Sequence, residues 1–397
     1  MAKKPLEGLR VIELGQLIAG PFAGKLFAEF GAEVIKIESP EGGDPLRKWR
    51  KLYKDTSLWW YVQARNKKSV TANLRLPEGQ EIVRRLAREA DVVIENFRPG
   101  TLEKWGLGYD ALSRENPGLV MLRMSGFGQD GPSRDLAGFG SIGESMGGLR
   151  YVTGFPDRPP VRPNLSIGDS LAALHGVIGV LMALHHRAAH GGKGQVVDVA
   201  LYEAVFNMME STLPEFDRFA ITRERTGSNL TGIVPSNTYM TSDGQHVVIG
   251  ANADSIFKRL MNAIGRKDLA DDASLADNSG RAQRADELDQ VIGAWTGEHP
   301  VDHVLKILAE AQVPSGKIYS IADIVADPQY LARDMIRQAT LPDGTTLRVP
   351  GIVPKLSDTP GDLEWVGPKL GEHTDELLAR IGYSVAEIAA LRERKVI

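Results

Sequence analysis

Two short apolar segments, separated by a loop and a helix-forming stretch, open the chain. Residues 9–14 and 33–38 have the length and apolar content of buried strands. Between them, a loop at residues 15–20 precedes Pro21, which suits the first position of a helix, and a helical pattern runs on to Phe30. A strand, a helix and a second strand form a βαβ unit, which requires the two strands to be parallel.

The same alternation continues along the first half of the chain. It predicts helices at 78–90 and 166–190 and strands at 92–95, 119–125 and 195–201. Beyond residue 225 the pattern changes to hairpin signals at Asp243-Gly244 and Asp343-Gly344, with helices at 254–264, 284–296, 301–312, 371–381 and 384–394. We therefore predict an α/β protein: a large Rossmann-like domain with a parallel sheet at 1–215, a small α+β domain at 225–325, and a C-terminal part at 326–397 that returns to the large domain.

Composition excludes several classes of protein. The net charge of −4 over 397 residues provides no basic field for nucleic acid. The absence of cysteine rules out disulfides and thiolate nucleophiles, and it fits a reducing compartment. The N-terminus lacks the apolar core of a signal peptide. The most apolar stretch, 171–184, is shorter than the ~20 residues that a membrane span needs. We expect a cytoplasmic protein in which this stretch is a buried core helix.

A glycine motif at residues 126–131 matches G-x-G-x-x-G and follows a predicted strand. A nicotinamide-dependent dehydrogenase is therefore a rival hypothesis. However, Pro132 and polar residues follow the motif instead of an apolar helix, and no strand-ending acid lies about 20 residues further on. Glu38 is a suitable acid after the first βαβ unit, but the loop before that helix lacks the middle glycine. The motif argues against a dehydrogenase, while a ligand site at the carboxyl ends of the strands stays open.

An acid begins the longest predicted helix. Ser166 precedes Asp169 in the spacing of a capping box, with Asp in place of the usual Glu or Gln. Asp169 could simply cap the helix and favour its positive end. The same surroundings would keep a carboxylate ionised, and such a carboxylate can attack a thioester to form a covalent intermediate. Spacing leaves both readings open. His186 and His190, four residues apart near the helix end, lack an evident third ligand, so we expect no metal.

A series of short motifs extends in a fixed order from residue 6 to residue 375. They are Leu-Glu-Gly-Leu-Arg-Val-Ile-Glu-Leu at 6–14, Ala-Gly-Pro at 19–21, Gly-Ala-Glu-Val-Ile-Lys-Ile-Glu at 31–38, Asn-Lys-Lys-Ser at 66–69, Glu-Asn-Phe-Arg-Pro-Gly at 95–100, Gly-Leu-Gly-Tyr at 106–109, Ser-Gly-Phe-Gly-Gln at 125–129, Gly-Asp at 168–169, Gly-Lys-Gly-Gln at 192–195 and Leu-Gly-Glu-His-Thr-Asp at 370–375. This series resembles the class III CoA-transferases, the formyl-CoA transferase and carnitine CoA-transferase family. It is most similar to the succinyl-CoA:dicarboxylate members.

The resemblance implies a reaction. Asp169 would attack an acyl-CoA to form an aspartyl–acyl anhydride, and the released CoA thiolate would convert it to an aspartyl–CoA thioester. A second free acid would then take the CoA away by the same steps in reverse. The partners implied are a CoA thioester and a small carboxylic acid, with no metal or redox cofactor. The family's chains are interlocked, which implies a homodimer.

The resemblance also implies where CoA binds. The matching positions are Ile18, Ala19, Ala72, Asn73, Leu74, Arg75, Asn96, Phe97, Arg98, Lys104, Ala137, Gly138, Phe139 and Gly140. The cations among them suit the pyrophosphate and 3′-phosphate of CoA, because guanidinium groups grip phosphate in forks.

Several positions depart from the formyl-CoA transferases. Ile18 replaces a glutamine and Ser39 an arginine, which argues against formyl-CoA and oxalate as substrates. Phe139 stands where an α-methylacyl-CoA racemase needs a histidine, and phenylalanine cannot move a proton. Gly140 replaces an acid that many transferases carry at this position. Glu144 is a candidate to take over the role of that acid.

A dicarboxylate acceptor of the glutarate, itaconate, mesaconate or citramalate type is the remaining prediction. Its far carboxylate would need a cation, and the candidates are Arg47, Arg150 and Arg162. Three alternatives stay open: a racemase on the same fold, a formyl-CoA:oxalate CoA-transferase, and a CoA-binding protein without catalysis.

Overall fold

The computed structural model describes residues 3–397 in two compact units. The large unit comprises residues 3–149, 163–210 and 332–397, and the small unit comprises 150–162 and 211–331. Within the range 1–215 predicted as one large domain, the chain enters the small unit at 150–162 and returns to the large unit before α7 (Ile167–Ala189).

A six-stranded sheet forms the centre of the large unit. The strand order is β5-β2-β1-β6-β7-β8, and every neighbouring pair is parallel. The strands are β1 (Arg10–Glu13), β2 (Glu33–Glu38), β5 (Lys67–Thr71), β6 (Val92–Glu95), β7 (Val120–Ser125) and β8 (Val196–Ala200). The predicted parallel α/β architecture is confirmed. The pairing is in register along the first βαβ unit, where Ile12 lies opposite Ile35.

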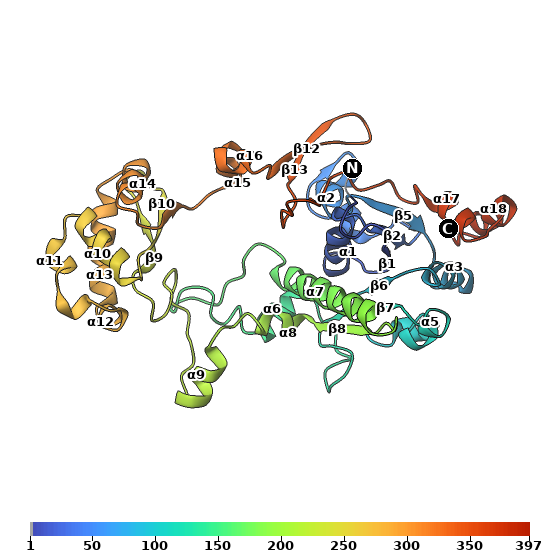
Figure 1. Cartoon of the computed structure of the whole chain (residues 1–397), viewed down its shortest axis with the longest axis horizontal. Helices are drawn as coiled ribbons and strands as arrows, with labels where there is room; N and C mark the ends of the chain where they lie inside the picture. The colour runs from blue at the N-terminus through green and yellow to red at the C-terminus, as the bar shows by residue number, and fades with distance from the viewer. Residues whose placement is uncertain (1–2) are drawn as a thin grey trace. The chain divides into compact units, whose positions relative to one another are not determined.

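Helices cover both faces of this sheet (Figure 1). α1 (Ala19–Glu29), α7 and α8 (Leu201–Phe206) pack on one face, and α3 (Pro77–Ala87), α17 (Thr374–Arg380) and α18 (Val385–Glu393) pack on the other. Side chains alternate between the faces along each strand. Val11 packs with α1 and α7, whereas Ile12 packs with α3.

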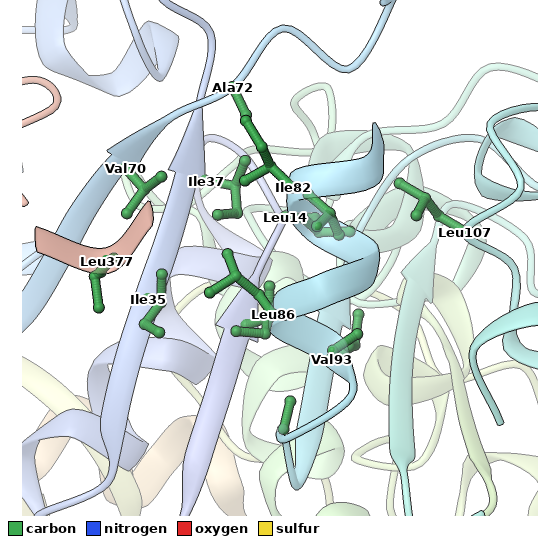
Figure 2. Packing of buried hydrophobic residues seen from close by; sticks show 14 of the residues in the cluster. Leu14, Ile35, Ile37, Val70, Ala72, Ile82, Leu86, Val93, Leu107 and Leu377 are labelled. Carbon is green, nitrogen blue, oxygen red and sulfur yellow. The ribbon is translucent and has the colours of Figure 1, made fainter. Parts of the chain in front are cut away.

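The core on the α3 side is shown in Figure 2. Leu86 of α3 is fully buried against Ile35 and Val93 of the sheet, and Leu377 of α17 joins the same cluster. Truncating such a buried leucine to alanine typically costs about 2–5 kcal/mol. The C-terminal segment therefore contributes to the core that supports the carboxyl ends of the strands.

Smaller elements complete the large unit. They are β3 (Leu52–Tyr53), β4 (Thr56–Ser57), α2 (Leu58–Gln63), α4 (Thr101–Lys104), α5 (Tyr109–Glu115), α6 (Gly140–Met146), β12 (Ile336–Thr340) and β13 (Thr346–Pro350). β12 and β13 form the antiparallel hairpin predicted around Asp343-Gly344.

Two predicted features of the large unit need correction. α1 begins at Ala19, so Pro21 occupies its third position and not its first. α7 is buried on one face only: Ala172 and Val180 lie in the core, but Leu174 and Ile178 are exposed. α7 is also the one helix within residues 3–397 that is long and apolar enough to cross a membrane, by length and composition. Its packing against the sheet identifies it as a core helix with one uncovered face.

The small unit contains a three-stranded antiparallel sheet of order β11-β10-β9. The hairpin of β9 (Ser236–Met240) and β10 (His246–Gly250) was predicted from Asp243-Gly244. The other elements are α9 (Thr212–Phe219), α10 (Asp254–Ala263), α11 (Lys267–Ala270), α12 (Asn278–Gln283), α13 (Ala285–Gly297), α14 (Val301–Glu310), β11 (Ser315–Lys317), α15 (Ile321–Ala326) and, at its boundary, α16 (Pro328–Ala332). Its own core holds Phe257, Leu288 and Val304.

Candidate active site

The strand order places a topological switch point between β1 and β6. From β1 the chain winds through β2 to β5 at one edge, and from β6 through β7 to β8 at the other. Parallel α/β sheets bind ligands outside the carboxyl ends of the strands at such a point. The two loops that flank it follow β1 at residues 14–18 and β6 at residues 96–100.

A hollow of about 460 Å³ opens at this edge of the sheet. Its walls are Leu14, Gln16, Ile37, Glu38, Ser39, Glu41, Ala72, Asn73, Leu74, Arg75, Phe97 and Trp105. Five predicted CoA contacts are therefore brought together: Ala72, Asn73, Leu74, Arg75 and Phe97. The volume lies within the usual range for small-molecule sites. A larger hollow of about 790 Å³ beside Lys68 and His373 includes no predicted site residue.

Exposed cations stand near this hollow. Arg75 is part of its wall, Arg98 follows Phe97, and Lys104 ends α4 one residue before Trp105. All three side chains are exposed, and none forms a salt bridge with any of residues 3–397. Unpaired cations of this kind are available to phosphate groups.

The loop after β1 is held by three buried or half-buried side chains. The Asn96 side chain accepts a hydrogen bond from Gln16 N at 2.7 Å and donates one to Gln16 O at 2.9 Å. Lys36 Nζ donates to Gly15 O at 2.7 Å, and Asp44 accepts from Leu17 N at 3.0 Å. These bonds stabilise Leu17 at φ 64°, a left-handed conformation that is unfavourable for leucine.

This arrangement changes the expected role of Asn96. Its amide oxygen and one of its N–H donors bind the Gln16 backbone, so its side chain positions the loop after β1. Ile18 and Ala19 are both buried at the start of α1, where Ile18 O accepts from Gln63 Nε2.

A cluster of buried charged side chains contacts the loop after β1. Lys36 lies between Glu13 and Asp44 at 2.9 and 2.8 Å, and Lys67 contacts the other oxygen of Glu13 at 2.7 Å. Burial, reinforced by the repulsion of Lys36, lowers the pKa of Lys67 to about 8. Burial also opposes the charge on Lys36, but Asp44 and Glu13 outweigh it and raise that pKa.

Arg47 is buried and already engaged within the protein. Its guanidinium binds Glu38 through Nε and Nη2, donates to Pro368 O through Nη1, and lies 3.7 Å from the ring centroid of Trp60. This bidentate ion pair with Glu38 argues against Arg47 as the substrate cation, whose role stays a prediction. Arg150 and Arg162 belong to the small unit, and their role stays a prediction.

Glu95, at the end of β6, was not singled out by the sequence. It is fully buried, accepts from Phe97 N at 2.7 Å and from Arg123 Nε at 2.7 Å, and Arg123 continues to Glu103 of α4. Burial raises the pKa of Glu95 to about 7, although Arg123 acts against it. The chain of contacts connects the loop carrying Phe97 to α4, which carries Lys104. The available signal was an acid at the end of a buried strand, directly before Asn-Phe-Arg-Pro-Gly.

Asp169 lies at the same edge of the sheet. α7 leads into the parallel strand β8, so its first turn stands at the carboxyl ends of the strands. Asp169 is the third residue of α7 and is half-buried. The predicted capping box is wrong, because the Ser166 side chain makes no capping hydrogen bond. Gly168 N donates instead to Glu144 Oε1 of α6 at 3.3 Å.

The predicted stretch 137–140 reaches Asp169. A Cβ atom on Gly140 would lie 1.9 Å from Asp169 Oδ2, so only glycine leaves room for the carboxylate in this position. Two residues earlier, Gly138 packs against the backbone of Gly126, just beyond β7. Ala137 is exposed and Phe139 is 68% exposed, which leaves its ring available beside the nucleophile candidate.

Within residues 3–397, no three His, Cys, Asp or Glu side chains gather in a way that could hold a metal ion. His186 and His190 stack with their ring centroids 4.7 Å apart at the end of α7. The glycines at 126–131 are not followed directly by a helix, since the next one, α6, starts at Gly140. The dinucleotide motif therefore lacks the helix that it requires.

The family model for "CoA-transferase family III" matches residues 6–374. The chain belongs to this family. It is a CoA-transferase, as the sequence motifs predicted. The chain is 51% identical over 396 residues to a succinyl-CoA–D-citramalate CoA-transferase of Chloroflexus aurantiacus, covering 99% of this chain and 98% of that one. It is 36% identical to a succinate–glutarate CoA-transferase of Agrobacterium fabrum, covering 96% of each.

A solved structure supports the fold. The crystal structure of a CAIB/BAIF family protein from Brucella suis matches with a TM-score of 0.82 and 36% identity, covering 96% of this chain and 100% of that chain. Relatives also include a formyl-CoA:oxalate CoA-transferase of Streptomyces avermitilis at 33% identity, covering 99% of this chain and 100% of that one.

Proposed function

We propose that this CoA-transferase moves CoA from succinyl-CoA to a small dicarboxylate of the citramalate or malate type, with Asp169 as the nucleophile. The observation that carries the proposal is the half-buried Asp169 carboxylate at the start of α7, on the same edge of the sheet as the hollow at the ends of β5, β2, β1 and β6. Relatives that cover the whole chain at 42–51% identity are named for transfer from succinyl-CoA to D-citramalate or L-malate.

The reaction follows from carboxylate chemistry. An Asp169 oxygen attacks the succinyl carbonyl, the C–S bond breaks, and CoA leaves as a thiolate from a succinyl–aspartyl anhydride. The thiolate then attacks the aspartyl carbonyl and releases succinate, which leaves CoA bound to Asp169 as a thioester. The acceptor carboxylate attacks this thioester, and the returning thiolate attacks the acceptor carbonyl of the second anhydride. Each intermediate stays activated, so no metal, redox group or net proton transfer is required.

The phosphate-bearing part of CoA is assigned to the exposed cations. Arg75, Arg98 and Lys104 can bind its phosphates while the wall of Leu74 and Phe97 accepts the adenine. The sulfur end would extend along residues 137–140 toward Asp169, because Gly140 contacts that carboxylate. Arg150 and Arg162 are kept as candidates for the far carboxylate of the acceptor.

We further propose that the chain acts as a homodimer in the cytoplasm. The large unit exposes apolar side chains that a monomer would leave in water: Ile142, Met146, Leu174, Ile178, Leu181, Met182, Phe206 and Met208. Such a set is typical of an interaction surface. Analytical ultracentrifugation should give a mass near twice 43.3 kDa at micromolar concentration. A monomer there would contradict the dimer.

The chemistry is tested by intact-mass measurement after incubation with succinyl-CoA. We expect an adduct that hydroxylamine converts to a hydroxamate at Asp169, and no adduct in Asp169→Asn. A wild-type protein without any adduct would contradict the mechanism.

The acceptor is tested separately with succinyl-CoA and a panel of free acids. We expect turnover with D-citramalate or L-malate to exceed that with glutarate, and both to exceed that with acetate. Turnover with monocarboxylates alone would contradict the dicarboxylate assignment.

A further inference from the structure

Two residues of α6, Gly140 and Glu144, contact the first turn of α7. Gly140 and Glu144 are four residues apart, so they lie on the same face of the helix. Gly140 makes room for the Asp169 carboxylate, and Glu144, one turn later, accepts a hydrogen bond from Gly168 N. Both contacts fall on consecutive residues of the first turn of α7.

Glu144 is fully buried, so its carboxyl group needs hydrogen-bond partners within the protein. Removing a carboxyl group from water costs free energy unless hydrogen bonds compensate. The first N–H groups of a helix have no partner within the helix, and the Ser166 side chain does not supply one. Glu144 fills this role from a different helix, at the positive end of the α7 dipole. The cap of the nucleophile's helix therefore comes from α6.

α6 itself is held tightly in place. A Cβ atom on Gly143 would lie 2.9 Å from Leu201 Cβ, and one on Gly147 would lie 2.6 Å from Val205 Cβ, both on α8. The two glycines let the backbone of α6 pack directly on α8. Glu144 thus extends from a fixed helix to the turn that carries Asp169.

We propose that Glu144 is a positioning residue, which fixes the first turn of α7 so that the Asp169 carboxylate stays in the space left by Gly140. The proposal rests on the proposed role of Asp169 as nucleophile. A displacement of about 1 Å at a reacting group can cost on the order of 10²-fold in rate. Loss of the hydrogen bond between Gly168 N and Glu144 should allow such a displacement of the Asp169 carboxylate. The hollow assigned to CoA, at the ends of the other strands, should stay unchanged.

Three substitutions separate hydrogen bonding from charge and from shape. Glu144→Gln retains an acceptor oxygen at the same reach, so we expect acylation of Asp169 within about threefold of wild type. Glu144→Asp keeps the charge but is one methylene too short, and Glu144→Leu removes the acceptor. For both we expect the acylation rate to fall about 10- to 100-fold. Rapid-quench mass spectrometry with saturating succinyl-CoA measures this rate, and calorimetry measures CoA affinity, which should stay unchanged.

The control is Ser145→Ala on the exposed side of the same helix, which should acylate like wild type. If Glu144→Leu fails to fold, the acylation rates of Glu144→Gln and Glu144→Asp still test the proposal. Slow acylation in Gln with normal acylation in Asp would overturn the proposal, as would wild-type rates in Asp and Leu. A wild-type enzyme that forms no adduct would instead refute the nucleophile itself, so the two failures are distinguishable.

Discussion

The two halves of the carboxyl edge of the sheet are stabilised by different interactions. At β5, β2, β1 and β6, the loops are held mainly by buried ion pairs and charged hydrogen bonds, with Lys36 and Glu95 as examples, although Gly15 and Gly20 also pack closely in the loop after β1. At β7 and β8, the chain segments approach one another through glycines. Gly126 packs on Gly138, and Gly140 packs on Asp169. We refer to these as the charged half and the glycine half.

The difference follows from what each half has to do. The charged half carries extended loops whose backbone groups need partners, and buried side-chain charges supply them at a desolvation cost. The glycine half must bring a carboxylate close to neighbouring backbone, which only the absence of Cβ atoms allows. We therefore expect substitutions in the charged half to reduce stability and CoA affinity, and substitutions in the glycine half to reduce the chemical step.

The largest expected effect is that of Asp169→Ala. Removing a covalent nucleophile can cost up to ~10⁶ in kcat, and we expect a loss of at least about 10³-fold here. CoA affinity should stay close to wild type, because the charged half is untouched. Steady-state kinetics and calorimetry measure the two quantities. Activity within tenfold of wild type would refute the nucleophile.

Lys36→Met tests the charged half. It leaves Glu13 and Asp44 buried without this shared partner, and breaking a buried pair typically costs about 3–5 kcal/mol. The KM for CoA should also rise, because Gly15 and Leu17 lose their support. Denaturant unfolding measures the stability. Lys51→Met, on an exposed lysine, serves as the control and should be neutral.

Glu95 should make stability depend on pH. Burial raises its pKa from 4.5 to about 7, so the folded state binds this proton more tightly than the unfolded state. The resulting stabilisation is complete below pH 4.5 and is lost as the pH rises through about 7. At 1.36 kcal/mol per pKa unit, the loss is on the order of 3 kcal/mol. The difference in unfolding free energy between wild type and Glu95→Gln should change over this window, and parallel profiles would contradict the assignment.

Gly140→Ala tests the glycine half. The new Cβ must displace the Asp169 carboxylate, since it would lie 1.9 Å from Oδ2. We expect kcat to fall about 10- to 100-fold. CoA affinity should change much less than kcat, because only the sulfur end of CoA would pass residues 137–140, and overpacking should cost about 1–3 kcal/mol of unfolding free energy. If CoA affinity fell while kcat stayed normal, the proposed division between the two halves would be wrong.

The smallest effects are expected for single cations. Arg75→Ala, Arg98→Ala and Lys104→Ala should each raise the KM for CoA about 3- to 10-fold, because each removes one solvent-exposed charged contact worth on the order of 1 kcal/mol. The effect should diminish at high salt, and kcat should stay constant. Arg114→Ala, an exposed arginine at the amino edge of the sheet, is the matched control.

Local patterns determined much of this protein. Strand and helix periodicity, together with parallel βαβ connection, predicted five of the six strands of the parallel sheet and the longer helices within a few residues, but missed the edge strand β5 and the short helices. The order of the motifs identified the family and directed attention to Asp169 and to residues 72–75. These signals are readable because each depends on residues close together in the chain.

Tertiary structure decided which polar side chains are already engaged. Asn96 bonds Gln16 across 80 residues, Arg47 donates to Pro368 across 321, and Glu144 reaches Gly168 across 24. Such partners are set by the folding of distant segments onto one sheet edge, which no local pattern encodes. The sequence by itself named Asp169, whereas only the packing of α6 against α7 decided that Glu144 caps its helix and that Gly140 gives its carboxylate space.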